Sequence, residues 1–189
     1  VVDSSWYFAI EKEMAKLGFE IDNCRRDFIE KLNIVLTEKN HYFPLIKLNL
    51  KEKPIKNKEV FFEHLIDQRG QDLVSGRTNC GPHTDDLRGF YLEKETDTKY
   101  CSTGEQKLSI ISIILSNAKL IKEQHNTSPI LLLDEITAHL DEVRKENLFS
   151  ELLSLESQFF ISGTEVGIFN SLGTKAKFLE LDERKKFVA

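Results

Sequence analysis

The sequence of 189 residues lacks a phosphate-binding loop of the form G-x-x-x-x-G-K-[ST], although it contains 9 glycines. Such a loop supplies the backbone N–H groups and the lysine that hold nucleotide phosphates, and its Ser or Thr binds Mg²⁺. We therefore expect that this chain, by itself, does not bind a nucleotide tightly.

Long apolar runs and clustered cysteines are also absent. No run of roughly 18 apolar residues and no signal peptide are found, so we expect no membrane span. Cys24, Cys80 and Cys101 are scattered along the chain, and three cysteines without a C-x-x-C pair do not indicate a disulfide framework. These features predict a protein of the reducing cytoplasm.

An excess of positive charge is missing too. The 26 Lys and Arg residues are outnumbered by 31 Asp and Glu residues, which gives a net charge of −5 in an otherwise globular composition. This balance argues against a protein that coats DNA by bulk electrostatics. Any contact with DNA must come from a local basic surface, and one candidate contains Lys51, Lys53, Lys56 and Lys58. The alternative for these residues is a solvated, lysine-rich loop.

The most informative motif that is present is PILLLDEITAHLD, at 129–141. Its apolar residues 130–133 predict a buried strand of a parallel sheet. Asp134 and Glu135 follow at the carboxyl end of that strand, where α/β folds place their ligands. In a strand of this Walker B form, Asp134 would bind Mg²⁺ and Glu135 would orient or deprotonate a water that attacks a phosphate. The alternative is a strand followed by an acidic helix cap.

A second motif, CSTGEQKLSIISIILSNAKLI at 101–121, is a polar turn that leads into a helix. The helix is apolar on nearly every side, which predicts that it is buried. Its amino end carries free N–H groups and the positive end of the helix dipole, so Ser102 and Gly104 mark a candidate phosphate site. The alternative is that Ser102 is an ordinary helix cap.

Periodicity predicts the remaining elements. Apolar residues recur at helical spacing before and after Gly18, and the glycine predicts a break that makes this region a hairpin of two helices. Further on we expect a strand at 43–50, a helix at 59–68, a loop at 69–78 and a strand at 88–93. Asp141 should cap a helix over 143–155, and strands should follow at 158–161 and 178–181. The order strand, helix, strand predicts an α/β fold with parallel pairing.

These motifs together resemble the ABC-type ATPases of the SMC and RecF group, and the RecF family most closely. Residues 102–106 read S-x-G-E-Q like the family signature, and LLLDE with HLD resembles its Walker B strand and D-loop. GPHTDDL at 81–87 resembles the RecF segment GPHRDDL, with Thr84 in place of an arginine. Residues 162–164 take the place of the switch segment. The likeness runs from about Trp6 to Leu181.

The resemblance implies a fold and a division of the chain. Residues 41–189 would form the C-terminal lobe of an ABC-type (P-loop NTPase) ATPase head, and residues 1–40 the returning part of a helical arm domain. The family's P-loop lies near the start of the full protein. The chain is therefore expected to be a fragment, or to work with an N-terminal P-loop half or a second RecF-like subunit on another chain.

The resemblance also implies roles for individual residues. Heads of this family close on ATP as a head-to-tail dimer, in which the residues of the signature would touch the γ-phosphate held by the opposite subunit. These residues are Ser102, Gly104 and Gln106. Asp134 and Glu135 would serve the nucleotide of their own subunit, and Asp141 would line the dimer seam.

By resemblance, the completed protein would use ATP and Mg²⁺ in DNA replication, recombination and repair, including the SOS response. It would bind DNA at single-strand gaps and junctions, with RecO and RecR as partners.

Two other functions remain open. One is a non-catalytic remnant or interaction module that keeps the fold. The other is a metal-dependent phosphoesterase. Its candidate ligands are His83, Asp85, Asp86, Asp134, Glu135 and His139.

Overall fold

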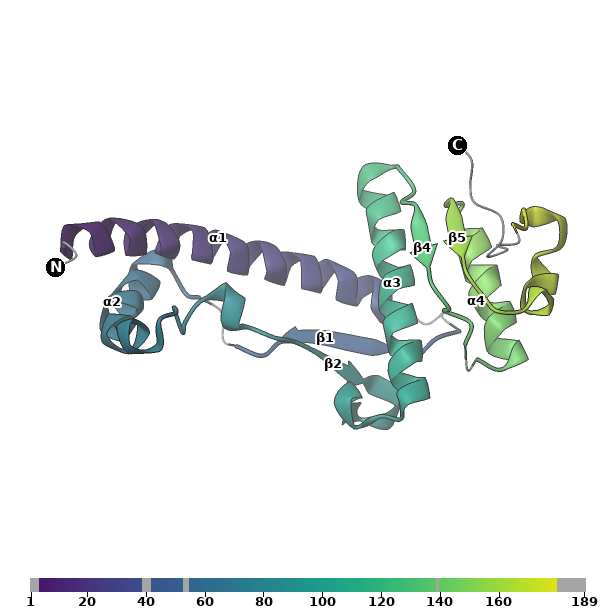
Figure 1. The fold of residues 1–189 in the computed structure, drawn as a ribbon, viewed down its shortest axis with the longest axis horizontal. Helices are drawn as coiled ribbons and strands as arrows, with labels where there is room; N and C mark the ends of the chain where they lie inside the picture. Colours follow the sequence, from purple (N-terminus) through teal and green to yellow (C-terminus); the bar gives the residue numbers. More distant parts are fainter. Residues whose placement is uncertain (1–3, 39–41, 53–54, 139, 180–189) are drawn as a thin grey trace, which may run out of the picture. The chain divides into compact units, whose positions relative to one another are not determined.

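A computed structural model describes residues 4–38, 42–52, 55–138 and 140–179 (Figure 1). The α-helices are α1 (Ser4–Leu36), α2 (Lys58–Ser75), α3 (Thr103–His125) and α4 (Glu142–Ser154). The strands are β1 (Ile46–Leu50), β2 (Leu87–Tyr91), β3 (Thr96–Asp97), β4 (Leu131–Leu133) and β5 (Phe159–Ile161). Short 3-10 turns are η1 (Pro82–Thr84), η2 (Leu92–Lys94), η3 (Thr98–Tyr100) and η4 (Val166–Lys175).

The chain packs as two compact units, Val1–Asn126 and Thr127–Ala189, and each is described by itself. The two units are defined by the contacts within this chain. They do not test the expected division after residue 40 into an arm and a head lobe, which stays a prediction.

Helix α1 runs through Gly18 without a break, so the predicted hairpin of two helices within residues 1–40 is wrong. A glycine inside a helix costs about 1 kcal/mol relative to alanine, but tertiary packing can override that preference. Here the glycine allows α2 to approach, since a Cβ at Gly18 would lie 2.6 Å from Cε1 of Phe61. The helix that packs on this part of α1 is α2, which continues to Ser75 where a loop was expected from residue 69.

This close approach gives a first prediction. Gly18→Ala should lower the free energy of unfolding by about 1–3 kcal/mol, because the new methyl group forces Phe61 to move. Gly70→Ala is the matched control in α2, where a Cβ meets no heavy atom within 4 Å among the residues that the structure describes. The control should raise stability by about 0.4–1 kcal/mol. Urea unfolding measures both, and a stabilised Gly18→Ala protein would contradict the packing described here.

The first unit contains an antiparallel sheet in the order β1-β2-β3. Its register pairs Ile46 with Tyr91 and Leu50 with Leu87, which confirms the strands expected at 43–50 and 88–93 over shorter ranges. Asn33 of α1 holds the backbone of Leu48 through two hydrogen bonds, of 2.7 and 2.8 Å. The core between α1, β1 and α3 consists of Leu32, Val35, Leu36, Ile46, Leu48 and Leu120.

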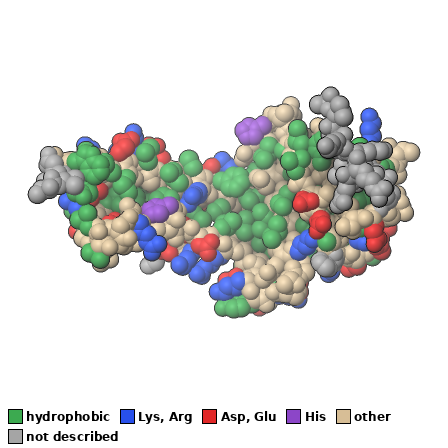
Figure 2. Space-filling view, in the orientation of Figure 1, with side chains coloured by type: hydrophobic (Ala, Val, Ile, Leu, Met, Phe, Trp, Pro, Cys, Tyr) green, Lys and Arg blue, Asp and Glu red, His purple; other side chains and the backbone are tan. Residues whose placement is uncertain are grey.

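Helix α1 also carries apolar side chains that the described residues cover only in part. Trp6, Ile10, Leu17, Ile21 and Phe28 are between 38% and 56% exposed. Their spacings of four and seven residues place them along one side of the helix. On the face drawn in Figure 2, hydrophobic side chains gather over α1. We call this set the α1 stripe.

The second unit is a strand–helix–strand segment. Strands β4 and β5 pair in parallel, with Leu131 opposite Phe159 and Leu133 opposite Ile161, and α4 connects them. The predicted parallel α/β arrangement is confirmed. The strand expected at residues 178–181 is not seen at 178–179, and residues 180–181 lie outside the described part of the chain.

The prediction that β4 is buried is right for only one of its faces. Leu131 and Leu133 are buried, whereas Leu132 is 77% exposed. Phe160 of β5 and the preceding Ile130 are 56% and 62% exposed. A pair of strands with a single crossover helix can cover one face, while parallel sheets in proteins are covered on both. We call Ile130, Leu132 and Phe160 the open sheet face.

Among the described helices, none combines the length and apolar character that crossing a membrane requires.

Candidate functional site

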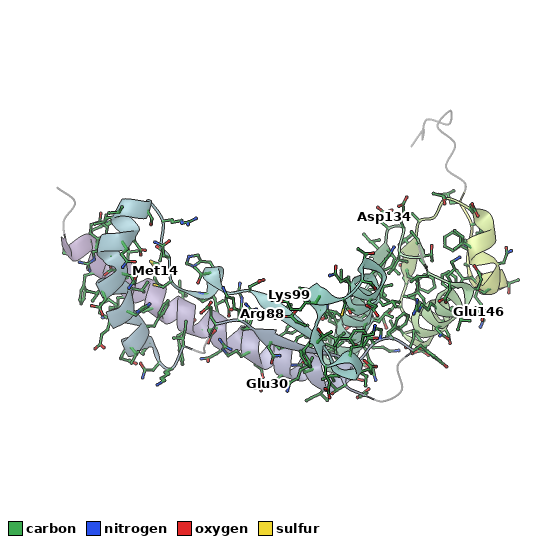
Figure 3. The ribbon with its side chains drawn as sticks, turned by 90° about the horizontal axis from the view of Figure 1, so that it is seen from below. Met14, Glu30, Arg88, Lys99, Asp134 and Glu146 are labelled. Atoms are coloured by element: carbon green, nitrogen blue, oxygen red, sulfur yellow. The ribbon has the colours of Figure 1, made fainter. Side chains whose placement is uncertain are left out.

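The carboxyl ends of β4 and β5 lie side by side, so the segment that resembles a Walker B motif lies beside residues 162–164, which take the place of the switch segment. Asp134 follows β4 directly (Figure 3), and Ser162 follows β5 with its backbone N–H bonded to the carbonyl of Leu133 at 3.0 Å. The hydroxyl group of Ser162 donates a hydrogen bond to Oδ1 of Asp134. The hydroxyl oxygen of Ser162 in turn accepts a hydrogen bond from the backbone N–H of Glu135 at 2.9 Å. Ser162 therefore fixes the two acidic residues against each other.

The turn after β4 directs both carboxylates outward. Glu135 has a φ of 45°, a left-handed conformation that few residues with a side chain adopt. Asp134 and Glu135 are exposed, while the following Ile136 and Thr137 are buried. The buried pair anchors the turn, so the acidic groups stay at the surface, where they can meet a ligand.

Asp141 begins α4, as expected. Its carboxylate accepts a hydrogen bond from the backbone N–H of Arg144 at 2.8 Å, which is an N-cap. The guanidinium group of Arg144 lies 3.4 Å from the same side chain. The cap is confirmed, and the place of Asp141 in a dimer seam stays a prediction.

The amino end of α3 is closed by a capping box. The backbone N–H of Glu105 bonds to Oγ of Ser102 at 3.4 Å, and Oε2 of Glu105 accepts from the backbone N–H and the hydroxyl of Ser102 at 3.0 and 2.9 Å. Lys94 of η2 forms an ion pair with the other oxygen, Oε1. Ser102 is therefore a helix cap, which leaves open whether it is also a phosphate contact.

Gln106, the third signature residue, is turned towards its own unit. Its side-chain Nε2 donates to the carbonyls of Thr98, Lys99 and Cys101 at 3.2, 3.3 and 3.3 Å. These bonds fasten η3 to the first turn of α3. The expected contact of Gln106 with a γ-phosphate in the opposite subunit stays a prediction.

Glu105 gives a second prediction, on acid stability. The ion-paired hydrogen bond from Lys94, and then the bonds from Ser102, lower the pKa of Glu105 from its ordinary value of 4.5 to about 2. Because the folded-state pKa is the lower one, this carboxylate stabilises the fold fully above pH 4.5 and loses that effect as the pH falls towards about 2. Wild-type protein should therefore melt above Glu105→Gln at pH 6, by a margin that shrinks on acidification. A difference in melting temperature between the two proteins that stays constant from pH 6 down to about 3 would contradict this expectation.

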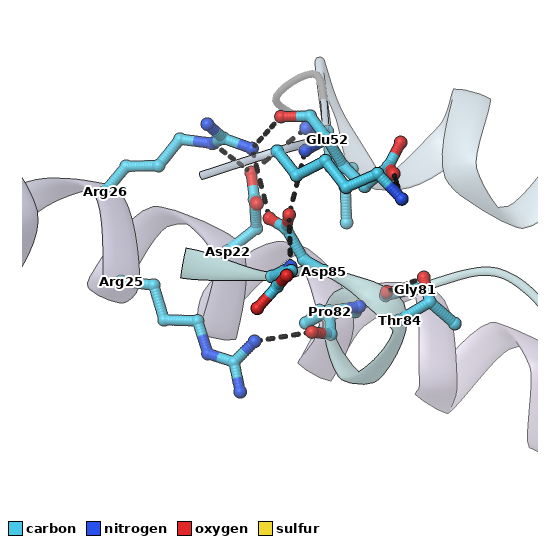
Figure 4. Close-up of polar contacts among 11 residues, drawn as sticks. Asp22, Arg25, Arg26, Glu52, Gly81, Pro82, Thr84 and Asp85 are labelled. Atoms are coloured by element: carbon cyan, nitrogen blue, oxygen red, sulfur yellow. Dashed lines mark hydrogen bonds and ion pairs between the residues drawn. The ribbon is translucent and has the colours of Figure 1, made fainter. Parts of the chain in front are cut away.

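The GPHTDDL segment forms η1 and the start of β2, and Asp85 fixes it in place (Figure 4). The side chain of Asp85 is 4% exposed. Its Oδ1 accepts hydrogen bonds from the backbone N–H groups of Glu52 and Asp86, both at 2.8 Å. Arg26 of α1 donates to the carbonyl of Glu52 at 3.1 Å and lies 3.9 Å from Asp85. This motif therefore fastens the end of β1 to α1.

The metal site of the phosphoesterase hypothesis does not form among the described residues. No group of three His, Cys, Asp or Glu side chains in that part of the chain is placed to hold a metal ion. Nε2 of His83 lies 2.9 Å from the carbonyl of Thr78, and Asp85 is held by backbone N–H groups. His139 lies outside the described residues.

The candidate DNA-binding lysines are exposed where the structure describes them. Lys51 and Lys58 lie 3.6 and 3.9 Å from the carboxylates of Glu52 and Glu59, which offsets part of their charge. Lys56 is exposed, and Lys53 lies outside the described residues. A contact with a phosphate backbone stays a prediction for this loop.

Sequence reasoning missed Lys94, Asp22 and Arg26. Arg26 bonds to Asp22 at 2.9 Å, and Asp22 in turn accepts from the backbone N–H of Ile55 at 3.0 Å. The four-residue spacing on α1 is a signal for the first of these pairs. Lys94 lies in the turn between β2 and β3, 11 residues before its partner, and no local pattern indicates this pair.

Comparisons with known proteins bear on these elements. No family model matches the chain. The DNA replication and repair protein RecF of Allorhizobium ampelinum is 37% identical over 191 residues, which cover 96% of this chain and 51% of the relative. RecF of Rhizobium meliloti is 34% identical over 187 residues, 94% of this chain and 50% of the relative. The chain thus spans about half the length of the curated relatives it matches.

Solved structures agree in fold. The recombination mediator protein RecF-ATPrS in the RecFOR pathway has a TM-score of 0.68 at 22% identity, over 87% of this chain and 46% of that one. The RecF-ATP structure gives 0.66 at 23% identity, over 84% and 45%. The expected α/β fold is confirmed, and it matches about half of each RecF structure. In sequence and in fold, the chain is RecF-like over nearly all of its own length, and its extent is consistent with the C-terminal half of RecF.

Proposed function

We propose that this chain is one half of a RecF-like ATPase of DNA repair and recombination, and that it acts together with a half that carries the P-loop. The observation that carries the proposal is the fixed group of Asp134, Glu135 and Ser162 at the ends of two parallel strands. The ends of such strands are where α/β proteins bind their ligands. Relatives of the chain are DNA replication and repair proteins, which agrees with this role.

The residues of this group fit Mg²⁺. The ion takes hard oxygen ligands and is usually held by one or two carboxylates plus waters and phosphate oxygens. Asp134 offers an exposed carboxylate, and the hydrogen bond from Ser162 sets its orientation. The hydroxyl oxygen of Ser162 is a further oxygen atom of the kind that Mg²⁺ takes as a ligand. When bound, Mg²⁺ would neutralise charge on the nucleotide phosphates. Glu135, next to this position, would then hold the attacking water.

Gly104 supports the expected signature role of the α3 end. A Cβ at this glycine would meet no heavy atom of the described residues within 4 Å, and its backbone is helical, so this part of the fold does not require a glycine here. A glycine in a helix is less stable than alanine by roughly 0.5–1 kcal/mol. Keeping that end of α3 free of a side chain suits the close approach of a phosphate group to the helix N–H groups.

The uncovered apolar surfaces support a P-loop half as the missing partner. The open sheet face leaves Leu132 at 77% exposure, and a sheet of two parallel strands needs further strands or a second helix layer to be stable. The α1 stripe offers a second apolar surface for such a partner. The relatives are about twice as long as the matched region, so they contain enough additional chain to supply both.

The proposed nucleic-acid partner is DNA at single-strand gaps and junctions, and the proposed protein partners are RecO and RecR, all by resemblance. The exposed lysines Lys51, Lys56 and Lys58 support a contact with DNA phosphates.

The third prediction tests the proposal on ATP. The chain alone should not bind ATP with micromolar affinity, because it has no P-loop cradle. The completed protein, meaning this chain together with its P-loop half, should bind ATP and then associate. Calorimetry measures the affinity, and sedimentation with and without ATP measures the association.

Two outcomes would count against the proposal. Micromolar ATP affinity of the pure chain would show a nucleotide site that does not depend on a P-loop. A completed protein that neither binds ATP nor associates in its presence would favour the second candidate, an interaction module that keeps the RecF fold. The absence of the P-loop pattern from the sequence is the observation that favours this candidate.

A further inference from the structure

The capping box at the amino end of α3 contains an acidic group where an anion is expected to bind. Oε2 of Glu105 lies 3.0 Å from the backbone nitrogen and 2.9 Å from Oγ of Ser102, the residue proposed to contact the γ-phosphate. A bare carboxylate in this place would repel a phosphate group, although the helix dipole attracts one. The two effects oppose each other unless the negative charge of Glu105 is compensated.

Lys94 supplies the compensating charge. Its ammonium group pairs with Oε1 of Glu105, the oxygen that does not bond to Ser102. The lysine is positioned by the short hairpin β2–β3, and its Nζ lies 5.9 Å from the ring centroid of Tyr91. The side chain of Glu105 is 23% exposed and that of Lys94 is 51% exposed, so the carboxylate is the better shielded partner.

We propose that Lys94 is a positioning residue of the signature: it cancels the charge of Glu105, so that Ser102 and the N–H groups of α3 can receive the γ-phosphate of ATP. The inference rests on the proposed function and adds a residue that precedes the signature motif. Lys94 acts through Glu105 and does not itself contact the nucleotide. Glu105 stays ionised at neutral pH, because the bond from Lys94 and then the bonds from Ser102 lower its pKa to about 2.

A charge effect and a purely structural effect differ in what the double variant does. If Lys94 serves only to hold the hairpin on α3, the double variant still lacks the ion pair, and its ATP-driven association stays as impaired as that of the single variant. If Lys94 serves to cancel charge, removing both charges restores the site, because the glutamine introduced by Glu105→Gln keeps the shape of the cap without repelling a phosphate.

The experiment compares Lys94→Met, Glu105→Gln and the double variant in the completed protein, by the ATP concentration at half-maximal association. Lys94→Met should raise that concentration by about tenfold or more, and the double variant should return to within about threefold of wild type. The increase for Lys94→Met should shrink at high salt, because partly exposed charges are screened. Lys99→Met is the matched control: Lys99 belongs to the neighbouring turn η3 (Figure 3), where it lies 3.7 Å from Asp97.

Each outcome decides the matter. If the double variant needs as much ATP for half-maximal association as Lys94→Met does, the inference is overturned. That result would mean that the lysine contacts ATP directly or only supports the fold. Unchanged association of Lys94→Met overturns it too, and leaves the proposed function intact as long as wild type still associates with ATP. If wild type fails to associate, the proposed function itself is wrong.

Discussion

Glu135→Gln should stop ATP turnover by the completed protein and leave its ATP-driven association intact. Glutamine keeps the shape of the side chain but cannot accept the proton of the attacking water, and loss of a general base typically costs about 10²–10⁴-fold in rate. The backbone bond from Glu135 to Ser162 does not involve the replaced carboxylate, so the turn after β4 should keep its geometry. Phosphate release and sedimentation, measured on the same sample, separate the two effects.

Two further variants make this result specific. Asp134→Asn should weaken ATP-driven association as well as turnover, because the proposed Mg²⁺ ligand is lost. Glu146→Gln, on the exposed side of α4 in the same unit, should change neither quantity (Figure 3). Turnover that survives Glu135→Gln would remove Glu135 from the mechanism.

Ser102→Arg should abolish ATP-driven association while the protein stays folded. The arginine side chain would fill the space at the amino end of α3 through which the opposite subunit's γ-phosphate must approach. Loss of the cap itself costs only about 0.5–2 kcal/mol of stability. Thermal melting reports on the cap, and sedimentation of the completed protein with and without ATP reports on the phosphate contact.

Gly104→Ala tests the same phosphate contact with a smaller change that leaves the cap residue in place. Within the described part of the chain the added methyl group meets no heavy atom within 4 Å, so it should leave the melting temperature unchanged or slightly raised. Weakened association in a protein that melts normally would then come from the site alone.

For Ser102→Arg, normal ATP-driven dimers together with a lowered melting temperature would contradict the phosphate contact. Ser102 would then act as a helix cap and nothing more.

The parts of the fold that follow from short sequence patterns could be predicted. The run of leucines before Asp134 indicated β4, and Asp141 indicated the start of α4, because strand polarity and helix caps depend on neighbouring residues. Ser102 was likewise weighed as a cap, and the structure shows the cap. What a pattern cannot show is whether a cap also contacts a ligand, since both roles use the same atoms.

The features that depend on distant residues could not be predicted. Gly18 has the local signature of a helix break, and only the ring of Phe61, 43 positions later, shows why it lies within a helix. The exposure of Leu132 likewise depends on which elements cover the sheet, which its own strand does not reveal. Asp85 drew attention as a possible metal ligand, yet its role depends on Arg26 and the backbone of Glu52.

The unbroken course of α1 has a mechanical consequence. A helix of 33 residues is about 50 Å long, and inside the first unit it contacts α2 near one end and α3 near the other. A hairpin hinged at Gly18 would absorb a displacement of α2 by bending, whereas a continuous helix transmits it as the rotation of a stiff rod. Strain applied to α2 would therefore reach α3, which packs on the other part of α1 through Leu120.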